Sequence, residues 1–221
     1  MTLLMRGLFW RTLFAVLLSF LLVGCGGQSS SKQASQNKPQ IDMKATYAEI
    51  NEILDSDIVK KDKDSVERTT YYRPFTEFGL YPSWQVTQTG DTVRMDAIIA
   101  DGTKWGTSKG MDSLVYWHTI IFITDEKKLE YQIPNCNGST GGGKEVFKNN
   151  TGMYEYYQTQ FNNLSTGYRL LVEGTNPTIR LKGVNKRKDI KLTKEMVTAL
   201  KAGLRLDELF MMTRGKIERP Q

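Results

Sequence analysis

Leu114-Val-Tyr-Trp-His-Thr-Ile-Ile-Phe-Ile-Thr124 is the most apolar run that follows the amino-terminal 25 residues. Apolar residues occupy both alternations of this run, as they do in a strand that is covered on both faces. We therefore expect a central β-strand here. Asp125 to Lys128 has the composition of a turn, and Leu129 to Ile133 reads as the returning strand, so the sequence predicts a hairpin.

Segments with the two-residue period of a strand lie on both sides of this hairpin. The upstream candidates are Thr69–Phe78, where Pro74 implies an edge or a break, Leu80–Thr87, and Thr92–Ile99, which we expect to be half-buried. The downstream candidates are Val146–Phe147, Met153–Phe161, Tyr168–Glu173 and Thr178–Leu181. Turns are predicted at Gly90-Asp91, Asn162-Asn163 and Gly174–Pro177, and longer loops at Gly102–Asp112 and Asn135–Gly143.

Two helices are predicted, one at each end of the strand-rich region. The first covers Lys44–Lys60, where Ile50, Leu54 and Ile58 form one stripe, and the charged run Lys60–Asp64 follows as a solvated turn. The second starts after Thr193, a favourable N-cap residue, has a stripe of Met196, Leu200 and Leu204, and continues toward Met211. No strand–helix–strand pattern is present, so the fold class is α+β, mainly antiparallel β, as a sandwich or curled sheet with an N-terminal and a C-terminal helix.

The amino-terminal segment has the layout of a secretory signal. Arg6 and Arg11 precede the apolar run Thr12–Gly24, and Leu22-Val23-Gly24-Cys25 closes it. This tetrapeptide resembles the lipobox of bacterial lipoproteins. In that family the Cys thiol receives a diacylglycerol, the preceding peptide is removed, and the new amino terminus is usually acylated, typically with palmitate. An uncleaved membrane helix is the alternative, but the run of 13 residues is shorter than the roughly 18–20 that span a bilayer.

The resemblance divides the chain into three parts. Residues 1–24 would be the signal peptide, 25–40 the lipidated Cys25 with a disordered tether that lacks large apolar residues, and 41–221 a single β-rich globular domain. Cys25 would tie the protein to a lipid bilayer of the cell envelope. Gly26 is not the Asp that often marks inner-membrane retention, so the family pattern favours the periplasmic side of the outer membrane in a Gram-negative cell. In a Gram-positive cell it favours the outer face of the cell membrane.

Charge and cysteine content limit the function classes. The formal charge is +6, and without Arg6 and Arg11 the mature chain would carry +4, a mild excess. We expect the basic cluster Lys182–Lys191 to be a solvated loop rather than a docking patch. An exported chain is a poor candidate for nucleic-acid binding. If Cys25 carries lipid, Cys136 has no partner within the chain, so no disulfide framework is expected.

The sequence contains no recognisable catalytic constellation. Gly138–Lys144 matches the start of a phosphate-binding loop, but Glu145 stands where Ser or Thr should hold Mg²⁺, so we interpret the segment as a flexible loop. A lone His118 in an apolar run is more often a hydrogen-bonded core residue than a ligand. One His and one spare Cys do not make a four-ligand zinc site, so no metal, cofactor or catalytic residue is predicted.

Aromatic residues are the remaining indication of a ligand. Trp105 in a Gly-rich loop and the strand face that carries Tyr154 and Tyr156 are the candidates for contact with a sugar ring or a protein. The alternative is that these are ordinary core and strand residues.

Three functions remain open at this point. The first is a non-enzymatic envelope lipoprotein that binds a protein or glycan partner. The second is an envelope hydrolase that acts on peptidoglycan or polysaccharide through paired carboxylates. The third is a structural or assembly factor without a ligand.

Overall fold

A computed structural model of the chain describes residues 42–74, 82–104, 114–137, 140–148, 150 and 152–218. The predicted signal segment, Cys25, the tether and Trp105 lie outside these residues. The elements, in chain order, are α2 (Met43–Leu54), β1 (Val59–Asp64), β2 (Thr69–Pro74), β3 (Ser83–Thr89), β4 (Thr92–Lys104), β5 (Thr119–Ile123), β6 (Lys128–Gln132), β7 (Lys144–Lys148), β8 (Gly152–Gln160), α3 (Asn162–Glu173), β9 (Thr178–Lys182), β10 (Arg187–Lys191) and α4 (Lys194–Thr213).

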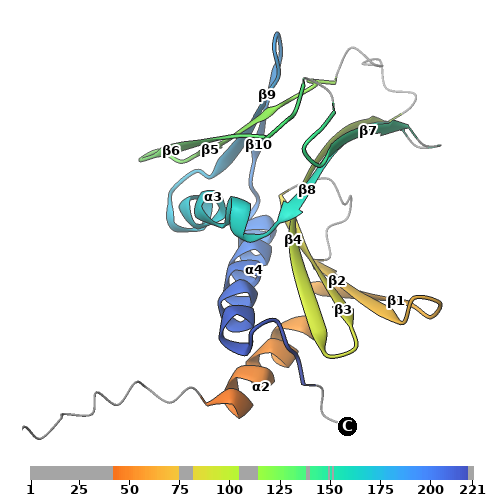
Figure 1. Cartoon of the computed structure of the whole chain (residues 1–221). Coiled ribbons are helices and arrows are strands. Elements are labelled where there is room, and N and C mark those ends of the chain that lie inside the picture. The colour runs from red at the N-terminus through yellow and green to blue at the C-terminus, as the bar shows by residue number, and fades with distance from the viewer. Residues whose placement is uncertain are drawn as a thin grey trace, which may run out of the picture. The chain divides into compact units, whose positions relative to one another are not determined.

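The strands form two antiparallel sheets, which confirms the predicted α+β class with helices near both ends. The first sheet has six strands in the order β1-β2-β3-β4-β8-β7, and the second has four in the order β10-β9-β5-β6. The chain leaves the first sheet after β4, builds β5 and β6 of the second, returns for β7 and β8, and completes the second sheet last (Figure 1). Each sheet is therefore assembled from two separate parts of the chain.

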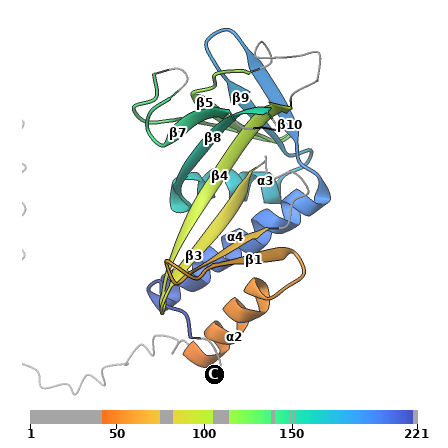
Figure 2. The same ribbon diagram turned by 90° about the vertical axis from the view of Figure 1, so that its right-hand side faces the viewer.

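Helices cover one face of each sheet. Helix α4 packs on the six-stranded sheet, where the indole Nε1 of Trp84 donates a hydrogen bond to the carbonyl oxygen of Ala199 at 2.7 Å. Helix α3 packs against β5 and α4, and Phe122, Phe161 and Tyr168 meet there in edge and tilted ring contacts. Figure 2 shows α4 running along the back of β3 and β4. The buried side chains between these layers form a continuous apolar core.

The apolar run Leu114–Thr124 divides at His118. Its second half is β5, an interior strand whose residues are mostly buried, and β6 returns beside it as predicted. Leu114, Val115 and Trp117 are buried, but residues 114–118 are not part of the strand. Tyr116 is partly exposed and adopts a left-handed φ of 52°. The prediction of one strand through the whole run is therefore right for its second half. Buried polar contacts, described below, replace strand pairing in its first half.

Strand β4 is longer than predicted and is not uniformly half-buried. From Ala97 to Ala100 every residue is buried, so both faces of this stretch are covered. Gly102–Lys104, predicted as loop, continues the strand and pairs with β8.

The prediction of a strand at Tyr168–Glu173 is wrong, because these residues form the second half of helix α3. Leu164, Tyr168 and Leu171 are spaced four and three residues apart and are buried on one side of the helix. Gly167 allows the close approach, since a Cβ there would lie 2.4 Å from the ring of Phe122.

Two predicted charged loops are strands. Helix α2 ends at Leu54 rather than Lys60, Ile58 is exposed, and Lys60–Asp64 lies within β1 instead of a turn. The basic cluster Lys182–Lys191 is the β9–β10 hairpin, in which Arg187–Lys191 pair with Thr178–Lys182. Both strands are stabilised by pairing with a neighbour, not by an apolar period of their own.

The C-terminal helix is confirmed. The Thr193 side chain caps it by accepting a hydrogen bond from the backbone N–H of Met196 at 3.3 Å, and the helix continues to Thr213. Leu200 and Leu204 of the predicted stripe are buried. Among the described residues, no helix combines the length and the apolar character needed to cross a membrane.

Candidate anion-binding site

The charged residues of strand β1 are divided between the two faces of the six-stranded sheet. Because successive side chains of a strand point to opposite faces, Lys61 and Lys63 share one face while Lys60 and Asp62 share the other. Lys60 and Arg73 both form ion pairs with Asp62, at 3.2 and 3.0 Å. The acids of the run are thus on the side away from Lys61 and Lys63.

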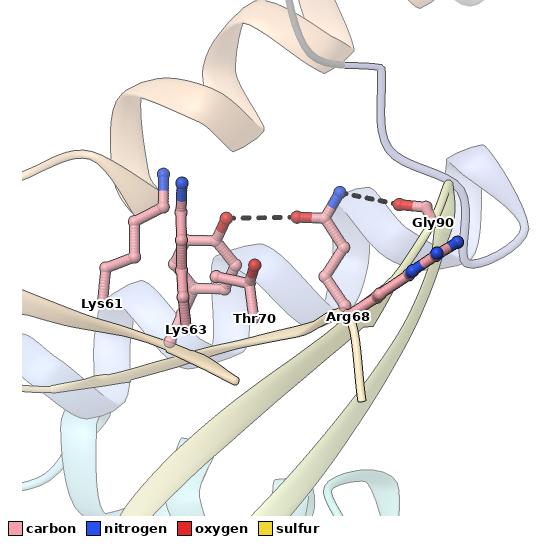
Figure 3. Close-up of a pocket in the computed structure, with 7 residues that line it drawn as sticks. Lys61, Lys63, Arg68, Thr70 and Gly90 are labelled. Carbon is pink, nitrogen blue, oxygen red and sulfur yellow. Dashed lines mark hydrogen bonds between the residues drawn. The ribbon is translucent and has the colours of Figure 1, made fainter. Parts of the chain in front are cut away.

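A pocket of about 320 Å³ lies on the face that carries these two lysines. Its walls come from three adjacent strands and their turns: Lys61, Lys63, Arg68, Thr70, Tyr72, Gln88 and Gly90. In Figure 3, Lys61 and Lys63 extend in the same direction, and the guanidinium of Arg68 extends toward Gly90. Three cations and no carboxylate line the pocket.

The β1–β2 turn positions Arg68. The Asp64 carboxylate accepts hydrogen bonds from the backbone N–H groups of Val66 and Glu67, at 2.9 and 3.0 Å, which closes the turn. Arg68 is the last turn residue and has a left-handed φ of 53°. Glu67 accepts a bond from the hydroxyl of Tyr71 at 3.3 Å and does not line the pocket.

The neutral residues of the pocket are held by hydrogen bonds. The Tyr72 hydroxyl donates to Gln88 Oε1 at 3.1 Å, and Gln88 Nε2 donates to the carbonyl oxygen of Gly90 at 2.9 Å (Figure 3). Lys61 Nζ lies 5.4 Å from the centroid of the Tyr72 ring, within cation–π range. Asp55, at the end of α2, is the acid that pairs with Lys61, at 3.9 Å.

This arrangement is suited to an anion. Lysine and arginine form strong charge-assisted hydrogen bonds with phosphate and carboxylate oxygens, and the Thr70 hydroxyl can donate another. In a water-like dielectric each close ion pair contributes about 1 kcal/mol, so three cations would bind one small anion only at millimolar concentrations or above. Tight binding at this open pocket would need a ligand with several anionic groups.

The aromatic residues predicted to face a ligand lie on the opposite face of the same sheet. Tyr154 is 7% exposed and stacks on Phe147 of β7, with 5.3 Å between ring centroids. Tyr156 is partly exposed and its hydroxyl donates to Gln158 Oε1 at 2.7 Å. Phe147, which was not singled out from the sequence, is 41% exposed and is the most accessible ring of the three.

The lysine of the segment that resembles a phosphate-binding loop is not available to a phosphate. Lys144 is fully buried and its Nζ lies 2.8 Å from Glu155 Oε1. Glu155 also accepts hydrogen bonds from three consecutive backbone N–H groups, those of residues 115–117, at 2.9, 2.9 and 3.0 Å. This lysine therefore neutralises an internal carboxylate and does not face solvent.

His118 and Cys136, for which the sequence indicates no role, both contact other residues of the fold. His118 is half-buried, with its Nδ1 3.0 Å from the hydroxyl of Thr119. Cys136 is half-buried and packs against the apolar core. Within the described residues no group of three or more His, Cys, Asp or Glu side chains is placed to hold a metal ion.

The pocket is not predicted by the sequence if Lys60–Asp64 is interpreted as a turn. The alternation of Lys and Asp was the available signal, since a period of two separates unlike charges if the segment is a strand. No protein-family model matches this chain, no curated protein matches it, and no solved structure matches it.

Proposed function

We propose that this chain is a bacterial cell-envelope lipoprotein whose globular domain is a non-catalytic binding module for an anionic partner. Acylated Cys25 holds the protein on the bilayer, and the pocket of Lys61, Lys63 and Arg68 binds acidic groups of an envelope glycan or protein. The observation that carries this proposal is the lining of that pocket, in which two lysines of β1 and Arg68 of the following turn meet and no carboxylate is present. The lipobox-like tetrapeptide supports the location.

Weak contact at one pocket is compatible with useful binding if the protein is anchored. Attachment to a membrane keeps the pocket near any ligand fixed in the same envelope, and a ligand with repeated acidic groups offers many sites to it. A polymeric or clustered anion therefore fits the pocket better than a single small metabolite.

The binding test uses the processed, lipidated protein in a non-ionic detergent, titrated with polygalacturonate and, separately, with uncharged dextran. We expect saturable binding of the acidic polymer only, weakened at least tenfold by Lys63→Glu with Arg68→Glu. The matched control is Lys60→Glu with Arg73→Glu, which makes the same charge change on the opposite face of the same sheet. Equal loss in both double variants would show a non-specific charge effect and would refute the pocket.

The anchor is tested separately. Cys25→Ser should leave the protein unprocessed or release it from the membrane fraction, and lipid should be absent from its mass spectrum. Lipid labelling that persists in this variant would contradict the proposal.

An envelope hydrolase is the second candidate, and Asp207 favours it. This residue lines a pocket of about 470 Å³ together with Met95, Phe161 and Phe210, and burial raises the pKa of its carboxyl group. A protonated carboxyl could serve as a general acid, but the mechanism requires a second carboxylate about 5–10 Å away, and this pocket lining contains none. Polysaccharide cleavage that disappears in Asp207→Asn would support this alternative over the binding module.

A further inference from the structure

The four-stranded sheet has an outer face, turned away from α3, that is mainly basic. Ile179, Leu181 and Ile190 point into the core, so the alternate residues of the same strands point outward. The cations of this outer face are Lys128, Arg180, Lys182, Arg187 and Lys191, and its acids are Glu130 and Asp189.

The acids neutralise the centre of the outer face and leave its ends positive. Arg180 forms a two-pronged ion pair with Asp189, at 2.6 and 2.7 Å. Glu130 lies 3.8 Å from Lys128. Lys182 and Arg187 are directly paired across β9 and β10, and Lys186 follows in the turn. These three cations surround the hairpin tip.

The hairpin tip also carries an exposed apolar side chain. Val184 is 79% exposed, and it lies between Gly183 and Asn185 at the end of the hairpin. Val184 and its neighbours line one end of a pocket of about 480 Å³ whose walls include Lys128, Arg180, Lys182, Lys186 and Arg187 and no carboxylate. An apolar tip ringed by cations matches the layered chemistry of an anionic bilayer, in which charged headgroups lie above hydrocarbon.

We propose that this outer face docks on the anionic headgroup surface of the bilayer that holds the acylated Cys25, with Val184 entering the headgroup region. This inference rests on the proposed anchor. Each Lys or Arg near such a surface strengthens binding about fivefold, and the anchor removes most of the entropy cost of a second contact. The acyl chains hold the protein on the bilayer, and a basic patch would add a second contact that fixes how the domain faces the headgroups.

The contact implies a particular orientation of the domain. Figures 1 and 2 place α2, which follows the tether, and the β9–β10 hairpin at opposite ends of the folded unit. The 16 residues from Gly26 to Ile41 can span at most roughly 55 Å. The contact would bring the hairpin end back to the membrane that holds the tether, so that the domain lies on the bilayer and does not stand away from it.

Lysine labelling tests this contact in the complete lipidated protein. The protein is reconstituted in vesicles of phosphatidylcholine alone or with 30% phosphatidylglycerol, labelled with an acetylating reagent, and analysed by mass spectrometry. We expect Lys128, Lys182 and Lys186 to react at least fivefold more slowly on the anionic vesicles, and 0.5 M salt to remove the difference. Lys44, Lys194 and Lys201, which lie on α2 and α4, are the internal controls and should react equally on both.

Variants separate the outer face from net charge. Lys182→Glu with Arg187→Glu, or the neutral pair Lys182→Gln with Arg187→Gln, should abolish the protection of Lys128 and Lys186. Lys194→Glu with Lys201→Glu makes the same charge change on α4 and should preserve it. Flotation with phosphatidylcholine vesicles reports on the anchor alone. If it fails, anionic vesicles added to the protein still report on the outer face.

Three results would overturn the proposal. Equal labelling on neutral and anionic vesicles would exclude the contact. Slower labelling of the control lysines as well would indicate general adsorption of the domain. Protection by polyphosphate or an oligonucleotide on neutral vesicles, without protection by phosphatidylglycerol, would assign the outer face to a soluble polyanion.

Discussion

Lys144 and Glu155 form an ion pair between adjacent strands, 2.8 Å apart, and the side chains of both are 0% exposed. The Lys144 ammonium also lies 4.9 Å from the centroid of the Trp117 ring. Glu155 belongs to the six-stranded sheet. The N–H groups that donate hydrogen bonds to it belong to the segment that leads into β5 of the other sheet. One carboxylate thus joins the two sheets at residues 115–117, which lie outside the paired strands.

Removing either member of this ion pair should lower the free energy of unfolding, and replacing Glu155 should lower it more than replacing Lys144. Glu155→Gln leaves a buried ammonium without its anion, and we expect it to lower the free energy of unfolding by about 3–5 kcal/mol. Lys144→Met should cost less, because the carboxylate keeps its three N–H donors. Urea unfolding measures both variants. Lys144→Met combined with Glu155→Gln should lose less than the sum of the two, and strict additivity would contradict the pairing.

Gly203 in α4 should not tolerate a larger residue. A Cβ there would lie 2.3 Å from Trp84 Cδ1, and Trp84 is fixed by its bond to Ala199. Alanine gains about 1 kcal/mol of helix propensity, but overpacking costs about 1–3 kcal/mol, so Gly203→Ala should be destabilising overall. Thermal unfolding gives the result, with the exposed neighbour Lys201→Ala as the control that should change Tm little. A higher Tm for Gly203→Ala would mean that α4 lies farther from the sheet.

The hydrogen bonds of the Glu126 carboxylate should make the stability of the folded protein decrease in acid. The hydroxyl of Thr175 hydrogen-bonds to its carboxylate and lowers the pKa of Glu126 from 4.5 to about 2. A lowered pKa in the folded state gives stability that is present above about pH 4.5 and is lost as pH falls through 2. Glu126→Gln should flatten the pH dependence of Tm in this window. Thr175→Val should reproduce the effect, and an unchanged slope in both would contradict the assignment.

Asp207 should show the opposite pH dependence. Burial raises the pKa of its carboxyl group, so the folded protein holds the proton more tightly than the unfolded chain does. The stabilising effect is present at low pH and is lost as pH rises through the raised value. Asp207→Asn should therefore be at least as stable as the parent at pH 7, and the difference should shrink or reverse near pH 3. Chemical unfolding at the two pH values measures this.

The parts of the fold that could be predicted are those where local signals agree. In α4 the Thr193 cap and the stripe of Leu200 and Leu204 indicate the same helix. In β5 and β6 an apolar run, a polar turn and a returning strand indicate one hairpin. These signals depend on residues close together in the sequence, so the chain alone contains them.

Helix α3 could not be predicted in the same way. Tyr168-Arg-Leu-Leu-Val-Glu173 is short, apolar and rich in residues that strands favour, and its period does not distinguish the two structures. Packing decides for a helix, because Gly167 fits against Phe122 and Tyr168 against Phe161 and Phe122. Phe122 lies on β5, far from α3 in the sequence, so no local pattern reveals this contact.

The cationic pocket was also beyond local prediction. Strand β1 has charged residues on both faces, so no apolar period marks it, and its pairing with β2 is what makes it a strand. Arg68 and Gln88 then join the lysines across β2 and β3, at positions that only the register defines.

The exchange of the chain between the two sheets has a consequence for biogenesis. Strands β9 and β10 complete the second sheet, and the acceptor for Trp84 lies in α4, so neither layer is whole until the chain through α4 is available. A nascent chain delivered amino end first would remain without a finished core until α4 has been made. Fragments that end before β9 should accordingly fail to fold and should be degraded by proteases.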